Sequence, residues 1–278
     1  MEIESSQLFS VLGHPQRLAV FRLLMRRYPD RVSAGDIAAA LDLRGSTLSV
    51  YLSALRDAGL ISQHRQGTSL LYAADVDAAG RLTSYLFEDC CRSRPDLCRP
   101  AAFNPREGRT MAHRKYNVLF ICTGNSARSI MAETLLRDLA GDRFTAYSAG
   151  TRARSELNPN AVELLTSKGH DITPLRAKHI AEFQGPDAPV MDFVFTVCDR
   201  AANEDCPAWT GQPISAHWGQ PDPVKVTGTE AEKRLAFQQT YGALHNRISL
   251  FVALPLDSLD RMALQAHVDD IGRQRATT

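Results

Sequence analysis

The sequence contains no stretch of about 18 consecutive apolar residues, so we expect no membrane-spanning helix. Its first residues, Met1-Glu2-Ile3-Glu4, lack the basic patch and apolar run of a secretory signal, and we therefore expect a cytoplasmic protein. It also lacks an excess of charge of either sign, since 32 Lys and Arg residues balance 31 Asp and Glu residues. Any contact with nucleic acid must then depend on a local patch rather than on the overall charge.

Internal repeats and low-complexity tracts are absent as well, and 278 residues with 44% apolar content are typical of two ordinary globular domains. We expect a first domain over residues 1–98 and a second over 115–278. Residues 99–114 between them are rich in Pro, Gly and Arg without apolar periodicity, which predicts a linker.

The first domain has the pattern of several helices followed by a hairpin. A break at residues 13–15 divides one apolar helical stripe into two helices. Two further helices, over 34–41 and 46–57, are joined by a tight turn containing glycine, which is typical of a helix-turn-helix. Residues 60–72 read as two short strands around a turn. This order of elements predicts a mainly helical winged helix.

The helix over 46–57 is the candidate DNA-reading helix of this domain. Short hydroxyl side chains near its N-terminus can donate to phosphates and base edges, where the helix dipole also attracts anions. A winged helix that makes only protein contacts is the alternative. The candidate DNA-binding residues are Ser46, Thr47, Ser49, Val50, Tyr51, Ser53 and Arg56 on this helix, with His64 and Arg65 on the wing.

Three cysteines gather at the end of the first domain, where Cys90 and Cys91 follow an apolar helix and Cys98 lies one loop later. In a reducing compartment, clustered thiols indicate metal binding or redox chemistry. No histidine lies between His64 and His113, whereas structural zinc usually has four nitrogen or sulfur ligands. Three thiolates suit pyramidal arsenite or antimonite better. A zinc or cadmium site and incidental surface cysteines remain alternatives.

The stretches 12–18, 46–49, 55–60 and 67–72 (LGHPQRL, STLS, LRDAGL, GTSLLY) resemble the ArsR/SmtB family of metalloregulatory repressors, and the resemblance covers residues 5–98. It implies a homodimer that holds an inverted-repeat operator and releases it when metal binds. The three-cysteine group resembles the C-terminal arsenite site of one branch of that family. The family's other arsenic site, a Cys-x-Cys pattern on the DNA-reading helices, is missing here.

The second domain opens with a short apolar strand over 117–121 that runs into Cys122 and then, after five residues, Arg128 and a helix. Consecutive loop amides at a helix N-terminus form an anion site, and an arginine there can clamp a tetrahedral oxyanion. We expect this field to lower the pKa of the Cys122 thiol and make it a nucleophile. A chance Cys-x5-Arg is the alternative. The predicted oxyanion-binding residues are Thr123, Gly124, Asn125, Ser126, Ala127, Arg128 and Ser129, the last also donating to the thiolate.

A nucleophilic thiol needs an acid for the departing oxygen, and Asp222 is the candidate because it follows a short apolar strand, between two prolines. A turn-forming aspartate is the alternative. Together with the Cys-x5-Arg motif, this arrangement resembles the low-molecular-weight tyrosine phosphatase fold over residues 115–275. The resemblance implies an α/β domain with a central parallel sheet.

Two more cysteines, Cys198 and Cys206, flank a polar segment that leaves the end of a strand over 192–197. Parallel sheets gather functional groups at the carboxyl ends of their strands, where Cys122 also lies, so a thiol relay is expected. The segment resembles arsenate reductases of the phosphatase fold, although seven residues separate these cysteines instead of six. Val224 stands where tyrosine phosphatases commonly have an aromatic residue, which weakens the phosphotyrosine interpretation.

We therefore expect an arsenite-responsive repressor fused to an arsenate reductase whose catalytic residues are Cys122, Arg128, Asp222, Cys198 and Cys206. No organic cofactor is expected. The expected partners are operator DNA, arsenate, arsenite or antimonite as inducer, and an external thiol reductant of the thioredoxin, glutaredoxin or mycoredoxin type. One alternative is a winged-helix regulator fused to a phosphotyrosine phosphatase. Another keeps DNA binding and treats the second domain as a catalytically idle oxyanion sensor.

Overall fold

The computed structural model divides the chain into two compact units, Met1–Met111 and Ala112–Thr278, and each is described by itself. The described residues are 2–92, 115–154, 156–185, 187–204, 209 and 212–273. Among them, no helix combines the length and the apolar character needed to cross a membrane.

Two helices of the first unit begin at signals in the sequence. Pro15 opens α2, and the His14 ring caps it by accepting from Gln16 N at 3.2 Å. Ser33 Oγ caps α3 by accepting from Asp36 N at 3.1 Å. The helices are α1 (Glu2–Leu12), α2 (Pro15–Arg27), α3 (Ala34–Leu41), α4 (Gly45–Asp57), α5 (Val76–Tyr85) and a π-helical turn, η1 (Leu86–Cys90).

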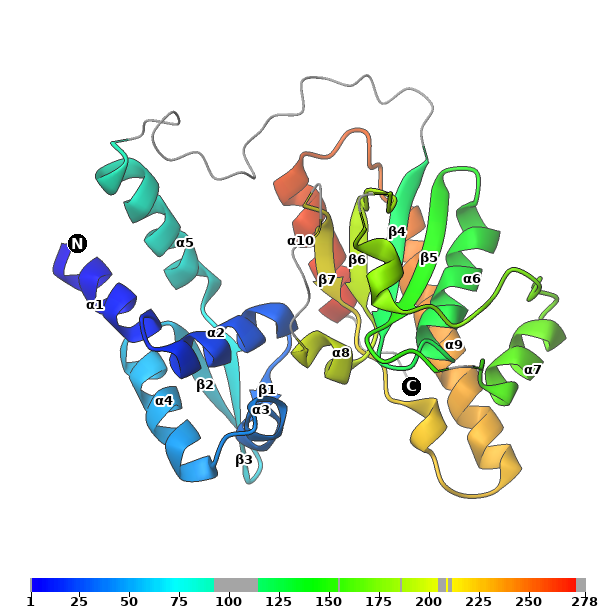
Figure 1. Cartoon of the computed structure of the whole chain (residues 1–278), viewed down its shortest axis with the longest axis horizontal. Helices are drawn as coiled ribbons and strands as arrows, with labels where there is room; N and C mark the ends of the chain where they lie inside the picture. Colours follow the sequence, from blue (N-terminus) through cyan, green and yellow to red (C-terminus); the bar gives the residue numbers. More distant parts are fainter. Residues whose placement is uncertain are drawn as a thin grey trace. The chain divides into compact units, whose positions relative to one another are not determined.

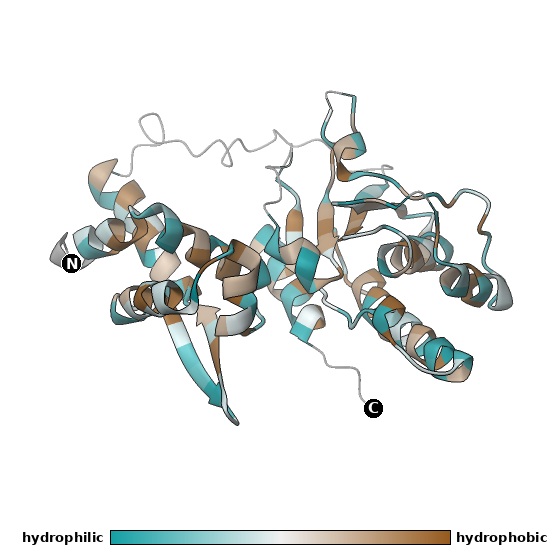
Figure 2. Cartoon of the chain, turned by 60° about the horizontal axis from the view of Figure 1, so that its bottom comes forward, coloured by the Kyte–Doolittle hydropathy of each residue, from teal (hydrophilic) through white to brown (hydrophobic). Residues whose placement is uncertain are grey.

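A three-stranded antiparallel sheet completes this unit, in the order β1 (Val32–Ser33), β3 (Ser69–Ala74), β2 (Ile61–Gln66) (Figure 1). Helix α4 buries Leu48, Leu52 and Leu55, and Figure 2 shows that β2 is mostly hydrophilic towards the tip of the hairpin. An α3–α4 pair followed by an exposed hairpin is a winged helix, as the sequence predicts.

The second unit is built on a four-stranded parallel sheet in the order β5 (Phe144–Gly150), β4 (Tyr116–Cys122), β6 (Phe193–Thr196), β7 (Ile214–His217). Helix α6 packs on β4, β5 and α9, and α10 packs on β7 and α9. This confirms the predicted α/β fold. The helices are α6 (Arg128–Ala140), α7 (Pro159–Ser167), α8 (Asp199–Asn203), α9 (Glu230–Val252) and α10 (Arg261–Arg273), with short 3-10 turns η3 (Ile180–Phe183) and η4 (Pro223–Lys225).

The core of this unit lies on both faces of the sheet. Strand β4 is buried from Val118 to Cys122, as expected for a central strand of a covered parallel sheet. Trp218 stacks on Phe195 with ring centroids 3.9 Å apart, and its indole N–H donates to Val268 O of α10 at 3.0 Å. The loop that follows β7 is thereby fixed to the core.

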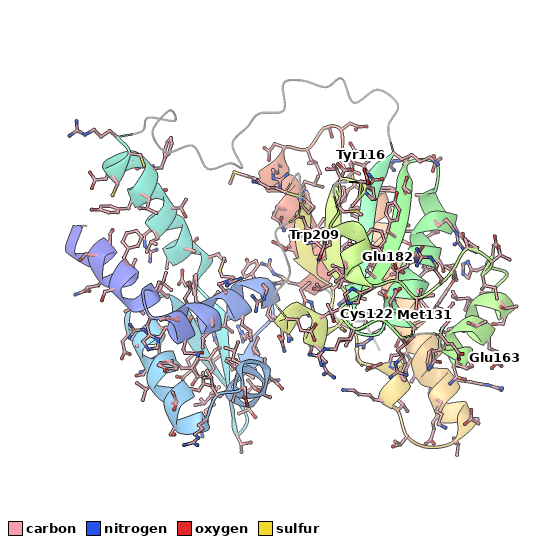
Figure 3. All side chains as sticks on the ribbon, viewed as in Figure 1. Tyr116, Cys122, Met131, Glu163, Glu182 and Trp209 are labelled. Carbon is pink, nitrogen blue, oxygen red and sulfur yellow. The ribbon has the colours of Figure 1, made fainter. Side chains whose placement is uncertain are left out.

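The strand order places the candidate thiols side by side. The chain passes from β4 to β5 on one side and then to β6 on the other, so a topological switch point lies at the carboxyl ends of β4 and β6. Cys122 ends β4 and Cys198 follows β6. Figure 3 shows Cys122 at one end of the sheet and Tyr116, the first residue of β4, at the other.

Candidate active site

The loop from Cys122 to Arg128 connects β4 to the N-terminus of α6. Its carbonyl groups bond outward: Thr123 O accepts from Arg152 N at 2.8 Å and Gly124 O from Arg154 N at 2.9 Å. Because the N–H and C=O of a trans peptide point in opposite directions, the amides of Gly124 and Asn125 face the other side of the loop. Such consecutive amides form an anion-binding concavity at a positive helix end.

The Cys122 thiol is buried at the base of this loop. Its Sγ accepts from Asn125 N at 3.1 Å and lies 3.0 Å from Ser129 Oγ. Burial raises the pKa of Cys122 above its usual value and Cys198 raises it further, while the Ser129 hydrogen bond and the Arg128 charge lower it. The sequence-based expectation of a lowered pKa is wrong for this structure, because removal of the sulfur from water outweighs the nearby positive charge.

Asn125 holds the loop in shape. Its backbone is in the left-handed region, with φ at 45°, which asparagine tolerates better than most residues. The fully buried side chain donates from Nδ2 to Ser129 Oγ at 2.9 Å and to Ser148 Oγ at 2.8 Å. Its Oδ1 accepts from Lys178 N at 2.6 Å. The Ser129 hydroxyl beside Cys122 is therefore fixed by the Asn125 side chain, which contacts three separate segments of the chain.

A buried ion pair lies behind Asn125, and sequence reasoning missed it. Ser148 Oγ donates to Glu133 Oε2, and Lys178 Nζ donates to both Glu133 oxygens at 3.1 and 2.8 Å. Only 8% of the Lys178 side chain and 11% of the Glu133 side chain are exposed. Neither residue belongs to a recognisable motif, and a lone Lys or Glu in a sequence is usually a surface residue.

The structure brings Arg128 and Asp222, two of the predicted site residues, together. Arg128 Nη2 lies 2.9 Å from Asp222 Oδ2, and Nη1 donates to Gln220 O at 2.9 Å. Asp222 Oδ1 also accepts from Val224 N at 3.2 Å at the start of η4. The carboxyl group is thus positioned next to the arginine at the entrance of the loop.

Cys198 is buried next to the same loop. Its Sγ lies 3.5 Å from Thr123 Oγ1 and caps α8 by accepting from Ala201 N at 3.4 Å. Two buried thiols, Cys122 and Cys198, therefore lie on adjacent strand ends. Cys206 lies outside the described residues.

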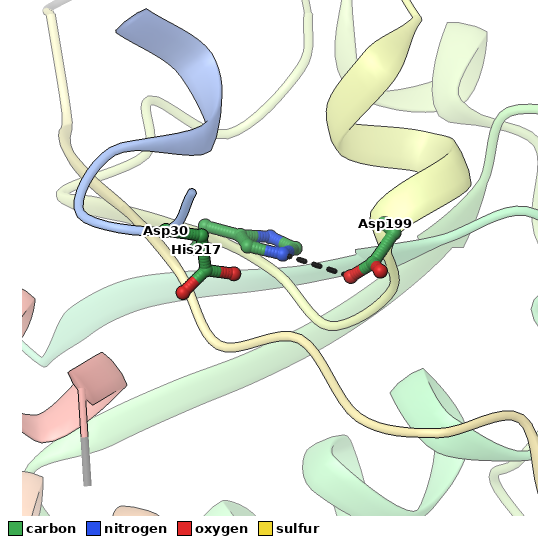
Figure 4. A group of neighbouring side chains, drawn as sticks. All are labelled: Asp30, Asp199 and His217. Atoms are coloured by element: carbon green, nitrogen blue, oxygen red, sulfur yellow. Dashed lines mark hydrogen bonds and ion pairs between the residues drawn. The ribbon is translucent and has the colours of Figure 1, made fainter. Parts of the chain in front are cut away.

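A second polar pair that sequence reasoning missed lies beside α8. The buried His217 ring is 3.2 Å from Asp199 Oδ1 through Nε2 (Figure 4) and 2.8 Å from Thr196 Oγ1 through Nδ1. A Cβ on Gly219 would lie 2.6 Å from His217 Nε2 and 2.8 Å from Asp199 Oδ1, so only glycine fits against this pair. The run His217-Trp218-Gly219 was the one signal in the sequence for this pair.

The candidate DNA-reading residues lie along α4, where Val50 is 66% exposed. Ser46, Ser49 and Arg56 are also exposed, whereas Thr47, Tyr51 and Ser53 are half-buried. Arg56 donates to Asp57 at 3.0 Å and to Gln63 Oε1 at 3.1 Å, which joins the helix to β2.

The predicted wing residues lie on β2. His64 is half-buried, with Nε2 3.2 Å from Ser62 Oγ, and the exposed Arg65 donates to Gly67 O at 3.3 Å. Arg65 thus lies on the hairpin, beside its turn.

The cysteines of the first unit are not all free thiols. Cys90 is exposed and free, whereas Cys91 is 6% exposed and disulfide-bonded. Cys98 lies outside the described residues. Arsenite binding by Cys90, Cys91 and Cys98 together stays a prediction, and in this structure it requires that the Cys91 disulfide be reduced first.

Comparison with known proteins matches both units. Residues 117–262 match the low molecular weight phosphotyrosine protein phosphatase family, and residues 12–64 match a helix-turn-helix domain. An arsenate reductase of Bacillus licheniformis is 39% identical over 138 residues, which are 49% of this chain and 95% of that relative. An arsenate reductase of Bacillus subtilis is 38% identical over 137 residues, 48% of this chain and 93% of the relative.

Among solved structures, an ArsR-like transcriptional regulator from Rhodococcus sp. RHA1 is 20% identical, with a TM-score of 0.30, and the match covers 34% of this chain and 88% of that one. The two family matches confirm the helix-turn-helix prediction for the first unit and the phosphatase-fold prediction for the second.

Proposed function

Because the chain belongs to the low molecular weight phosphotyrosine protein phosphatase family, we propose that its second unit is an arsenate reductase and that its first unit is an arsenite-responsive repressor. The observation that carries the reductase proposal is the pair of buried thiols, Cys122 and Cys198, on the adjacent ends of β4 and β6. A phosphatase needs one nucleophilic thiol, whereas reduction of arsenate needs two electrons and therefore a second thiol. The relatives named arsenate reductases support the same choice.

In the first step, Cys122 attacks arsenic while the loop amides and Arg128 hold the arsenate oxygens. Because burial raises the pKa of the thiol, the sulfur must lose its proton as substrate binds. An arsenate dianion in the loop can accept that proton. Asp222, held next to Arg128, protonates the departing oxygen, which leaves as water. A sulfur–arsenic bond forms and an arsenic–oxygen bond breaks, and arsenic is still pentavalent.

In the second step, the Cys198 thiolate attacks Cys122 Sγ. A disulfide forms, the electron pair of the sulfur–arsenic bond passes to arsenic, and arsenite leaves. Thr123 Oγ1, 3.5 Å from Cys198 Sγ, is placed to donate to that thiolate. Cys206 then attacks Cys198 and releases Cys122, and an external dithiol reduces the final disulfide. The two electrons lost by the thiols equal the two gained by arsenic.

The test compares two activities of the full chain, arsenate-dependent oxidation of a thiol donor and hydrolysis of an aryl phosphate. We expect reduction to dominate and Cys122→Ser to abolish it. Cys206→Ser should permit one turnover and no recycling. Dominant hydrolysis would favour a phosphatase instead, and a lack of both activities with retained oxyanion binding would favour a sensor.

For the first unit, we propose that a homodimer inserts α4 of each subunit into successive major grooves of an inverted repeat. The exposed residues of α4 and Arg65 on the wing support this role. Arsenite, bound by Cys90, Cys91 and Cys98 after reduction of the Cys91 disulfide, is the proposed inducer.

Selection of duplexes from a random pool by the full chain tests the DNA proposal, and we expect an enriched inverted repeat. The affinity should fall steeply with salt because phosphate contacts displace counterions. Recovery of duplexes without a common sequence would contradict it.

A further inference from the structure

Arg154 lies against the loop that holds the nucleophile. Its backbone amide donates to Gly124 O at 2.9 Å. A Cβ built on Gly124 would lie 3.5 Å from Arg154 Nε and 3.6 Å from Arg154 Cγ. The side chain of Arg154 therefore runs across Gly124, two residues after Cys122. An arginine at this place is fixed to the loop through its backbone while its side chain is exposed.

Arg154 differs from the neighbouring arginines in its partners. Arg152 Nε lies 3.5 Å from Glu204 Oε1, and Arg176 Nη2 lies 2.6 Å from Glu182 Oε2. Arg128 is paired with Asp222. Among the described residues, by contrast, nothing pairs with or accepts from the Arg154 guanidinium. Its full charge is available at the loop.

Arg128 alone does not balance the negative charge that gathers at the loop when an oxyanion binds. The Cys122 thiol and an arsenate dianion bring two negative charges together, wherever the shared proton lies, and Asp222 adds a third when it is ionised. Arg128 supplies one positive charge, and the Lys178 ammonium is neutralised by Glu133. A second guanidinium at the loop reduces this repulsion and attracts the incoming anion from solution.

We propose that Arg154 is a second oxyanion-binding residue. Its guanidinium attracts tetrahedral dianions, arsenate and phosphate alike, and donates to an oxygen that faces out of the loop. The proposal takes arsenate as substrate from the proposed function, but it concerns binding and requires no reduction step.

The test measures how well inorganic arsenate or phosphate protects Cys122 of the full chain from alkylation by iodoacetamide, with the alkylated site identified by mass spectrometry. The protection constant is the anion concentration that halves the alkylation rate of Cys122. We expect Arg154→Gln to raise this concentration about five- to tenfold for both anions, because a charge-assisted contact is lost. Arg154→Lys should restore part of the affinity. Raising the salt concentration should weaken protection more in the wild type than in Arg154→Gln, since salt screens an exposed charge.

The matched control is Lys115→Gln, which removes one exposed positive charge just before β4, about 20 Å of extended strand from Cys122. It should leave both protection constants within about twofold of the wild type. An equal loss in Lys115→Gln, or no loss in Arg154→Gln, would overturn the proposal. The proposal would also be overturned if Arg154→Gln left anion protection unchanged and slowed only the turnover that is supported by a protein reductant. That result would assign Arg154 to binding of the reductant.

Failure of the reductase proposal gives a different result. A wild-type chain that reduces no arsenate, but is protected by phosphate in an Arg154-dependent way, would contradict the reductase and support the second oxyanion contact.

Discussion

Lys178 Nζ lies 2.8 Å from Glu133 Oε2, and this buried pair is connected through Ser148 and Asn125 to the Ser129 hydroxyl, which contacts Cys122 Sγ. The loop that carries Cys122 is thus connected by hydrogen bonds to a buried ion pair, Lys178 with Glu133. A buried pair of this kind adds little stability over an apolar replacement, but removal of one partner leaves an uncompensated charge. The pair is therefore better understood as a device that fixes the geometry of the loop.

The first prediction follows from this pair. Lys178→Met should destabilise the second unit by about 3–5 kcal/mol, because the Glu133 carboxylate would stay buried without its partner. Urea unfolding followed by tryptophan fluorescence measures it, since Trp209 and Trp218, the two tryptophans of the chain, both lie in this unit.

The double variant Lys178→Met with Glu133→Gln is the control. It removes both charges and should recover much of the lost stability, yet oxyanion protection of Cys122 should remain weaker than in the wild type, because Ser148 then donates to a neutral amide instead of a carboxylate. Additive destabilisation by the two substitutions would show that the pair is not coupled.

The second prediction concerns the nucleophile. Burial raises the pKa of Cys122, and the Ser129 hydrogen bond is among the interactions that lower it. Ser129→Ala removes that hydrogen bond and should raise the pKa of Cys122 further, since a hydrogen bond to a charged group contributes about 1.5 kcal/mol or more, equivalent to about a tenfold effect. Below the pKa, alkylation of Cys122 at a fixed pH should slow about tenfold, and the pH profile should shift upwards.

Site-resolved mass spectrometry separates Cys122 from Cys198 in this experiment, and Cys198 serves as the internal reference. An unchanged alkylation profile of Cys122 in Ser129→Ala would mean that the 3.0 Å contact does not stabilise the thiolate.

The third prediction concerns pH and the stability of the second unit. Burial raises the pKa of Asp269 in α10 to about 6, against a weaker lowering effect of the Gln265 hydrogen bond. The folded state therefore binds a proton more tightly than the unfolded state. The stability that depends on this proton is fully present below about pH 4 and is lost as the pH rises to about 6.

Asp269→Asn stays neutral and can keep the Gln265 contact, so it should stabilise the unit at pH 7 by about 1 kcal/mol, a value reduced for partial contact with solvent. Urea unfolding at pH 4.5 and pH 7.5 measures the effect. The neighbouring Asp270→Asn, at an exposed carboxylate paired with Arg273 at 2.6 Å, is the control and should not reproduce the gain. Equal effects of both variants at the two pH values would contradict the prediction.

The sequence predicted those parts of the site that are local or that follow from strand order. The Cys-x5-Arg loop is contiguous between a strand and a helix, so its position at the end of β4 follows from the apolar pattern alone. Cys198 was also predicted, because parallel strands bring their carboxyl ends to one edge. The break at residues 13–15 and the helix over 34–41 were also predicted, because the signals that begin a helix act within one turn.

The parts that could not be predicted depend on tertiary contacts. Lys178 and Glu133 are 45 residues apart, and only folding shows that the lysine reaches back beneath the loop. The direction of the Cys122 pKa shift was wrong because Arg128 is visible in the sequence whereas the depth of the sulfur is not. The pairing of Asp199 with His217 likewise depends on the register of β6 and β7.

The fourth prediction joins the two units through the product of the enzyme. Arsenite needs free thiolates, but Cys91 is disulfide-bonded while Cys90 is free. We therefore expect arsenite to release the full chain from its operator only after a dithiol has reduced the disulfide bond of Cys91. Arsenate should release it only when Cys122 and the reductant are both present. A preference of about 100-fold for the DNA-free form, equivalent to about 2.7 kcal/mol, is enough to weaken the complex by the same factor.

Fluorescence anisotropy of labelled operator DNA measures the release. Changing Cys90, Cys91 and Cys98 to serine should abolish release and leave arsenate reduction intact. Release of DNA by arsenate from the Cys122→Ser protein would show that reduction does not precede derepression.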